Sequence, residues 1–217
     1  IRKYTHMKYC PICNNHAHSR LVKESVEYFQ CTNCRTLFSD PIENSGMIGG
    51  EHEVGRNAEQ NHLRIGRIDE MFGHSKKSNI NILDFGCGHG YLLNDLRTSG
   101  YACDGFDAYN EEYSKLPEKN KYHACTMIEC AEHLSSPYVE FDVIYRALRP
   151  NGILMIETSF IEIADQEGIE LENFFYINPK AGHATIYSHH VLDVWMCLKS
   201  FRPISHWNRH VRAYVKR

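Results

Sequence analysis

The chain alternates between short apolar runs and longer stretches whose apolar residues recur at helical spacing. The runs at 79–85 and 123–129 are too apolar for half-exposed strands, which is typical of strands buried on both faces of a parallel sheet. Apolar residues at helical spacing predict helices at 57–72, 90–98 and 136–148. Strands that alternate with helices predict an α/β fold with a mostly parallel sheet and helices on both of its faces.

The same pattern continues to the end of the chain. Further strands are expected at 101–107 and 152–158, and a further helix at 188–198. Two short segments at 202–207 and 211–215 predict a terminal antiparallel strand pair that closes the sheet.

The first part of the chain has a different organisation. Residues 21–29 alternate between apolar and polar side chains, as a hairpin strand does. Residues 42–56 are rich in glycine, glutamate and asparagine, which favours a linker. The sequence therefore predicts a small N-terminal module at 1–41, a linker at 42–56 and the α/β domain at 57–217.

Four of the nine cysteines form two C-x-x-C pairs within that module. Cys10 and Cys13 are followed, after seventeen residues, by Cys31 and Cys34. Two such turns place four thiolates at the corners of a tetrahedron, the geometry that Zn²⁺ adopts in structural sites. The pattern predicts a zinc ribbon whose folding depends on its metal, because so short a module cannot build an adequate core alone.

Other interpretations of these cysteines remain open at this point. The two pairs would also allow two disulfides or a redox C-x-x-C, although a redox pair normally opens a helix. His16 and His18 lie between the pairs and offer a replacement ligand, whereas a solvated loop histidine is the simpler interpretation. The remaining five cysteines show no pairing rule, which indicates a reducing, cytoplasmic compartment.

Charge excludes some function classes. The formal net charge of −3 argues against wholesale electrostatic binding of nucleic acid. Residues 199–217 carry six basic residues and no acid, and residues 162–172 carry five acids and no base, both consistent with solvated surface. No apolar run is long enough to predict a membrane span, and no signal-peptide pattern is visible.

The strongest chemical signal is a glycine-rich turn at 82–93, ILDFGCGHGYLL. An apolar strand ends in Asp84, glycines follow at 86, 88 and 90, and a helical pattern begins. Glycines allow a tight turn and close approach to a ligand, and the helix then presents unpaired N–H groups. Asp107 ends the next strand, twenty-one residues beyond Gly86, where an acid can accept both hydroxyls of a ribose. The third glycine of a nicotinamide-binding fingerprint would fall on Tyr91, which argues against that cofactor.

The D-x-G-x-G-x-G pattern resembles motif I of class I S-adenosylmethionine (SAM) dependent methyltransferases, which have a Rossmann-like fold. The segment MIECAEHLSSP, beginning at Met127, resembles the region after the fourth strand in small-molecule methyltransferases of the ubiquinone-biosynthesis type. The segment LRPNGILMIET resembles their next strand. The arrangement of a C-x-x-C ribbon ahead of such a domain resembles that of sugar C-methyltransferases. Certain ribosomal-RNA guanine methyltransferases also carry an N-terminal zinc ribbon.

The resemblance implies a set of cofactor-binding residues. The glycines would cradle the methionine part of SAM, Asp84 would hold its ammonium group, and Asp107 would bind the ribose hydroxyls. Adenine would rest against Tyr109 or the backbone near Ala108, and Ile128 and Glu129 would face the site. The full expected set is Asp84, Gly86, Cys87, Gly88, Gly90, Asp107, Ala108, Ile128 and Glu129.

The resemblance also implies candidates for the chemistry. Glu132 and His133 are expected to do acid–base work or contact the acceptor, with His183 joining from the substrate side. The alternative is that His133 packs over the cofactor while Glu132 holds backbone. Cys130 follows the fourth strand, where cytosine C5 methyltransferases keep a nucleophile, but without their preceding proline it is expected to be a buried thiol.

One departure from the family is expected to affect the fold. Only fifteen residues separate Asp107 from His123, too few for the usual helix, third strand and loop. The third strand is therefore expected to be absent or reduced to an edge, and no adenine-binding acid is assigned.

The resulting hypothesis is a methyltransferase that acts on a small-molecule acceptor, a sugar or another metabolite, with SAM as donor and a structural zinc ion. A second hypothesis is an RNA or protein methyltransferase that recognises its substrate through the ribbon, where residues 1–35 carry six basic and two acidic residues and where Tyr4, Tyr9, Tyr28 and Phe29 offer stacking surfaces. A third is a non-catalytic protein with the same fold. Salt-dependent RNA binding would favour the second, and failure to bind SAM the third.

Overall fold

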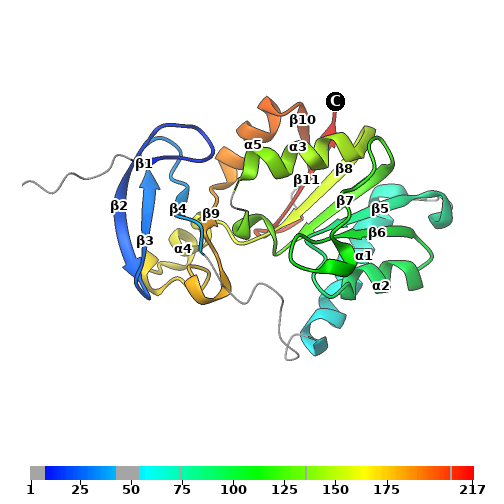
Figure 1. Cartoon of the computed structure of the whole chain (residues 1–217), viewed down its shortest axis with the longest axis horizontal. Helices are drawn as coiled ribbons and strands as arrows, with labels where there is room; N and C mark the ends of the chain where they lie inside the picture. The colour runs from blue at the N-terminus through cyan, green and yellow to red at the C-terminus, as the bar shows by residue number, and fades with distance from the viewer. Residues whose placement is uncertain (1–7, 43–53, 74, 135, 206) are drawn as a thin grey trace, which may run out of the picture.

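The computed structural model describes residues 8–42, 54–73, 75–134, 136–205 and 207–217. Most of the linker expected at 42–56 lies outside the described residues, as does Tyr4. Two β-sheets lie at opposite ends of the molecule (Figure 1). The larger belongs to an α/β body, and the smaller is an antiparallel sheet.

The larger sheet has the mixed topology expected from the sequence. Its strand order is β10-β11-β8-β7-β5-β6. The strands β6, β5, β7 and β8 run parallel, and β11 and β10 add to β8 as an antiparallel pair. The bounds are β5 (Asn81–Phe85), β6 (Ala102–Phe106), β7 (Tyr122–Ile128), β8 (Leu148–Glu157), β10 (Phe201–Ser205) and β11 (Val211–Lys216).

Helices cover both faces of this sheet, because neighbouring residues on each strand point to opposite sides. Ile82 packs in one cluster with side chains of α1 (Val54–Phe72) and α2 (Tyr91–Thr98). Leu83 packs in another cluster with side chains of α3 (Pro137–Ala147) and α5 (His189–Leu198). This layering confirms the predicted α/β architecture.

Two details differ from the expectation or sharpen it. The strand predicted at 152–158 already begins at Leu148, which pairs with Tyr122, and Asn151 adopts a left-handed backbone (φ 61°) within it. In the described part of the chain, no third strand lies beyond β6, whose single neighbour is β5. Between Phe106 and Tyr122 the chain forms only turns and the 3₁₀ turn η3 (Glu111–Tyr113), as the short spacing predicted.

The N-terminal module forms an antiparallel sheet that also contains a short strand, β9 (Thr185–Ile186), from the C-terminal part of the chain. Its strands are β1 (Lys8–Tyr9), β2 (His16–Lys23), β3 (Val26–Cys31) and β4 (Leu37–Ser39). The edge strand β9 pairs with β4, Leu37 opposite Ile186. The domain boundary predicted at residue 41 stays a prediction. In the structure, β9, from the C-terminal side of that boundary, belongs to the sheet of the N-terminal module.

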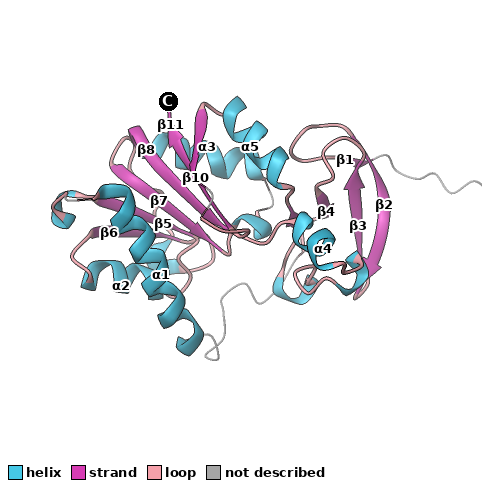
Figure 2. Ribbon diagram, turned by 180° about the vertical axis from the view of Figure 1, so that it is seen from behind, coloured by secondary structure: helices cyan, strands magenta, loops and turns pink. Residues whose placement is uncertain are grey.

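The segment between β8 and α5 packs against that sheet (Figure 2). It contains α4 (Ile161–Glu167) and the 3₁₀ turns η5 (Leu171–Asn173) and η6 (Pro179–Ala181). Tyr28 and Leu37 of the module share a buried apolar cluster with Phe174. Across the same contact, the acidic run pairs with bases of the module: Glu172 with Arg20 at 3.0 Å and Asp165 with Arg35 at 2.7 Å.

Within the described residues, no helix has both the length and the apolar character needed to cross a membrane.

Candidate functional site

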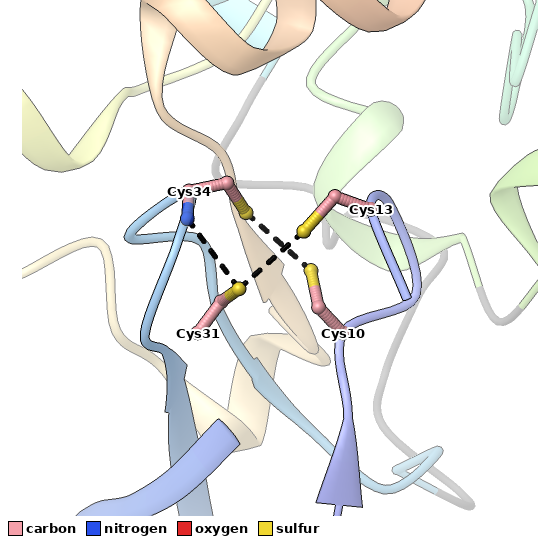
Figure 3. Close-up of side chains that lie close together, drawn as sticks. All are labelled: Cys10, Cys13, Cys31 and Cys34. Atoms are coloured by element: carbon pink, nitrogen blue, oxygen red, sulfur yellow. Dashed lines mark hydrogen bonds between the residues drawn. The ribbon is translucent and has the colours of Figure 1, made fainter. Parts of the chain in front are cut away.

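The four cysteines of the two C-x-x-C pairs converge (Figure 3). Their sulfur atoms lie within 4.8 Å of one another, with 3.5 Å between Cys10 and Cys34 and 3.5 Å between Cys13 and Cys31. A tetrahedral ion with Zn–S bonds of about 2.3 Å requires sulfurs about 3.8 Å apart, so the residues present fit a zinc ion. None of the nine cysteines forms a disulfide. His16 and His18 lie on β2 outside this group.

Hydrogen bonds favour thiolate character at the cluster. The backbone N–H groups of Ile12 and Cys34 donate to the sulfurs of Cys10 and Cys31, each at 3.4 Å. The hydrogen bond from Cys10 lowers the pKa of the Cys34 thiol to about 5, while the pKa of Cys10 is raised. A divalent cation that binds the four sulfurs would displace the proton shared by Cys10 and Cys34.

The glycine-rich turn follows β5 directly. Gly86 and Gly90 both have positive φ (77° and 78°), which glycine adopts without steric cost. A Cβ added at Gly86 would lie 2.3 Å from the Cys130 sulfur, so this glycine packs the turn against the segment after β7. Burial raises the pKa of the Cys130 thiol, which agrees with the expected inert thiol rather than a nucleophile.

Asp107, at the end of β6, holds the turn from the other side. One of its carboxylate oxygens accepts from the Gly88 N–H at 2.8 Å, and the other from the Tyr109 N–H at 2.8 Å. Asn110 donates to the Gly88 carbonyl at 2.8 Å. These bonds join the two strand ends that the sequence motif linked.

A cavity of about 550 Å³ opens at the carboxyl ends of β5, β7 and β8. Of the expected cofactor residues, those that line it are Asp84, Gly86, Cys87, Gly88, Ile128 and Glu129. Gly90, Asp107 and Ala108 lie outside its lining, on the β6 side of the turn. The parallel sheet thus places its open end where ligands of α/β proteins usually bind.

Sequence reasoning missed part of the lining. Helix α1 supplies residues at helical spacing. Others come from the end of β8, from the segment that follows η5 and from the segment that precedes β11. The amphipathic pattern of 57–72 identified the buried side of α1 but gave no sign that its polar side faces a cavity. The missed residues include Gln60, Asn61, Arg64, Arg67, Glu157, Phe175, Tyr176, Asn208 and His210.

Acidic groups dominate the inner wall of the cavity. Burial raises the pKa of Asp84 to about 6, and the Thr126 hydroxyl donates to this carboxyl at 2.8 Å. Glu157 is neutralised by Arg64 at 2.5 Å and by Arg67 at 3.0 Å. Glu129, in a left-handed backbone (φ 46°), has its pKa raised to about 9 by burial and by the neighbouring Glu132. A cavity of this kind favours a cationic ligand, which would relieve the buried acids.

Tyr176 connects the cavity to a second group of polar residues behind it. Its hydroxyl lies 2.5 Å from a Glu132 oxygen and 3.1 Å from a Glu129 oxygen. The other Glu132 oxygen accepts from the Thr158 hydroxyl at 2.9 Å. Glu132 itself is fully buried. A single phenolic hydroxyl therefore lies between two carboxyl groups, the buried Glu132 and Glu129 of the cavity wall.

The three expected catalytic residues lie together. The rings of His133 and His183 are 4.9 Å apart, and the His133 Nε2 is 3.8 Å from a Glu132 oxygen. Nδ1 of His133 donates to the Gly182 carbonyl at 3.1 Å, and Nδ1 of His183 donates to the Tyr176 carbonyl at 2.7 Å, since a carbonyl can only accept. In this tautomer each Nε2 atom carries a lone pair that can accept a proton or bind a ligand.

Comparison with known proteins identifies the domain. A family model described as a methyltransferase domain matches residues 52–206. No curated protein sequence matches the chain.

Several solved structures share the fold. A 1,6-didemethyltoxoflavin-N1-methyltransferase of Burkholderia thailandensis, with bound S-adenosylhomocysteine, is 14% identical with a TM-score of 0.50, over 92% of this chain and 99% of that one. A magnesium protoporphyrin IX methyltransferase of Synechocystis, also with bound SAH, is 12% identical with a TM-score of 0.52, over 81% and 91%. A Haloferax volcanii complex between the Trm112 methyltransferase activator and a methyltransferase is 14% identical with a TM-score of 0.51, over 71% and 75%. At such identities the likeness concerns the fold.

Proposed function

Because this chain belongs to the methyltransferase-domain family, whose characteristic sequence spans residues 52–206, we propose that it transfers the methyl group of SAM to a small-molecule acceptor, a sugar or another metabolite. The family and the fold make the chain a methyltransferase enzyme. The observation that carries the SAM assignment is the acidic cavity beside the glycine-rich turn.

The chemistry of the cavity lining fits the cofactor. SAM carries a sulfonium and an ammonium group, and both cations would be stabilised by Asp84 and Glu129. The turn at 86–90 would cradle the methionine part, and Asp107, with Ala108 beside it, would meet the ribose and adenine. Asp107 would do so while its carboxylate keeps the hydrogen bond to Gly88, since each oxygen can accept more than one donor.

Methyl transfer from a sulfonium is an in-line displacement, so the protein mainly has to position donor and acceptor. Good orientation contributes about 7–11 kcal/mol to lowering such barriers. An acceptor that must lose a proton needs a base. Glu132, His133 and His183 are proposed to contact the acceptor and take this proton, since each brings a nitrogen or oxygen atom within 4.8 Å of the other two.

Two observations favour a small molecule over RNA. Three basic side chains of the N-terminal module that face the body are already engaged: Arg20 and Arg35 pair with acidic residues, and Lys23 donates to the Phe174 carbonyl. Of the aromatic residues considered for base stacking, Tyr28 and Phe29 are buried, and Tyr9 lies against the His16 ring. Within its described residues, 8–41, the module therefore offers few unpaired charges to a nucleic acid, and of these aromatic rings Tyr9 alone is about half exposed.

The four-cysteine cluster is proposed to hold a structural Zn²⁺ that stabilises the N-terminal sheet. The donor set and the spacing fit that ion, and buried apolar contacts between the module and the α/β body give it a packing role. Free thiols throughout the chain favour the cytoplasm as its compartment.

The deciding experiment is a calorimetric titration of SAM and of S-adenosylhomocysteine into the zinc-loaded protein. We expect a dissociation constant on the order of micromolar, about −8 kcal/mol, that Asp84→Asn and Asp107→Ala both weaken. Asp104→Asn is the matched control, because Asp104 lies on the same strand as the Asp107 turn but pairs with Lys121 away from the cavity. Absence of binding by the folded protein would overturn the proposal and favour a non-catalytic role.

A further inference from the structure

The carboxylate of Glu132 is buried without a conventional counter-charge. It accepts hydrogen bonds from two neutral hydroxyls, those of Thr158 and Tyr176. Among the residues that the structure describes, no lysine or arginine forms an ion pair with it. A buried negative charge is costly unless a cation or a metal compensates it, so this position favours a cationic partner.

The histidines beside Glu132 are arranged as metal ligands usually are. Both hold their Nδ1–H on a backbone carbonyl, Gly182 for His133 and Tyr176 for His183. Such outer bonds fix the ring orientation and the tautomer, and they leave Nε2 as the donor atom to a metal. One potential ligand atom from each of the three residues, a ring nitrogen of each histidine and a Glu132 oxygen, lies within 4.8 Å of the other two. Nε2 of His133 is 3.8 Å from a Glu132 oxygen.

We propose that Glu132, His133 and His183 bind one divalent transition-metal ion, separate from the ion held by the four cysteines. Two imidazoles and one carboxylate form a donor set that suits Zn²⁺, Fe²⁺ or Mn²⁺ and that contains no sulfur. The hydroxyls of Thr158 and Tyr176 complete the site by orienting the carboxylate.

The site is accessible to an ion and leaves room for a further ligand. The His133 side chain is 20% exposed, whereas the Glu132 side chain has no exposed surface. Three protein ligands leave open coordination positions, as in catalytic metal sites. Tyr176, which lines the cavity and touches Glu132, connects the site to that cavity. This last step rests on the proposed function: an acceptor oxygen bound to the metal would lose its proton more readily.

Metal analysis of the full-length protein tests the proposal directly. Protein saturated with Co²⁺ and freed of excess ion should contain two ions per chain, falling to one in His133→Ala and in Glu132→Gln. His16→Ala is the matched control, because this histidine lies outside the cluster on an exposed strand, and it should keep both ions. Absorption spectra separate the two sites, since only the four-cysteine ion gives strong sulfur-to-cobalt charge-transfer bands.

The same spectra report on folding. Undiminished charge-transfer bands in the His133→Ala protein would show that its N-terminal sheet is intact and that the lost ion came from the second site. A single ion in the wild-type protein, or two ions in His133→Ala and Glu132→Gln, would overturn the proposal. Calorimetry with SAM on the same samples separates the two ideas: SAM binding without a second ion refutes only the metal site, and a second ion without SAM binding refutes only the proposed function.

Discussion

The hydroxyl of Tyr28 donates a 2.7 Å hydrogen bond to the main-chain carbonyl of His183, 155 residues further along the chain. The residue after His183 is held from both sides, because the Ala184 carbonyl accepts from the Ser39 N–H at 2.8 Å and the Ala184 N–H donates to the Glu132 carbonyl at 2.9 Å. The N-terminal sheet therefore helps to hold His183 in place. Loss of structure in that sheet should disturb the positions of the candidate catalytic residues Glu132, His133 and His183.

Tyr28→Phe should destabilise the protein by about 1–3 kcal/mol, because a buried carbonyl loses its donor while the ring stays in place. The loss should concentrate at 183–186 rather than at the glycine-rich turn, which lies in the other sheet. Urea denaturation measures the free energy of unfolding, and hydrogen–deuterium exchange locates the change.

Tyr9→Phe is the matched control for this substitution, because Tyr9 is about half exposed on the same module. Its free energy of unfolding should stay within about 0.5 kcal/mol of the wild type. Equal effects of the two substitutions, or unchanged exchange at 183–186 in Tyr28→Phe, would show that the hydrogen bond does not hold this segment.

Loss of the cysteine-bound ion should unfold more than the N-terminal module. Cys13→Ser removes one ligand, and the strands β3 and β4 should then lose protection against hydrogen exchange because metal binding supplies most of the folding energy of such modules. Strand β9 should lose protection with them, since Leu37 pairs with Ile186. The turn at 86–90 should keep its protection.

Cys197→Ser serves as the comparison, because this cysteine is exposed and lies outside the cluster. Its metal content, measured by mass spectrometry, should equal that of the wild type, whereas Cys13→Ser should contain one ion fewer. A Cys13→Ser protein with unchanged exchange in β9 would contradict the link between the two parts of the molecule.

The sequence was sufficient for the sheet and the turn because both depend on local patterns. Apolar runs and glycine positions predicted β5, β7 and the turn. The short spacing after Asp107 predicted a third strand that is absent or reduced to an edge, and among the described residues none lies beyond β6. The pairing of β9 with β4 could not be predicted, because two-residue strands have no periodicity and their contact joins distant parts of the chain.

The candidate site shows the same division. The motifs identified the ends of β5 and β7, whereas the contribution of Tyr176 depends on the packing of the segment between β8 and α5, which carries no motif. The sequence named Glu132, His133 and His183 as candidates, but their mutual distances follow from tertiary contacts such as the bond between His133 and the Gly182 carbonyl.

The affinity for SAM should fall as the pH decreases through about 6, because the buried Asp84 carboxyl takes up a proton there and loses its attraction for the ammonium group. Below that value the affinity should decrease by about tenfold per pH unit. Above it the contribution of Asp84 should be constant, and any further rise should come from Glu129, whose pKa is raised to about 9. Calorimetry between about pH 5 and pH 8 measures this, and Asp84→Asn should bind weakly and lose the change in affinity near pH 6.

The same raised pKa predicts an opposite trend for folding. In the unfolded chain Asp84 ionises near its ordinary value of 3.8, whereas in the folded protein it does so near 6. Its contribution to stability is thus fully present below the lower value and is lost as the pH rises through the upper one. Asp84→Asn should therefore gain stability relative to the wild type above pH 6, and a mutant that loses stability there would show that the carboxylate is not penalised by burial.

Gly86 and Gly88 provide a matched pair for testing how the turn is built. Both have positive φ (77° and 53°), so alanine at either position should cost about 1–2 kcal/mol of backbone strain. A methyl group at Gly86 would also overlap the Cys130 side chain, at 2.3 Å from its sulfur, whereas one at Gly88 meets nothing within 4 Å. Gly86→Ala should therefore be the more destabilising by about 1–3 kcal/mol in urea denaturation.

For SAM binding we expect the reverse order: among folded protein molecules, Gly88→Ala should weaken binding more than Gly86→Ala does. A methyl at Gly88 would occupy the cavity and weaken SAM binding with a modest effect on folding, because the space it enters is open. Adding Cys130→Ala to Gly86→Ala removes the sulfur from the contact, so the double variant should recover part of the stability that Gly86→Ala loses. Additive losses in the double variant would mean that Cys130 does not limit the turn, and that the positive φ of Gly86 alone explains its glycine.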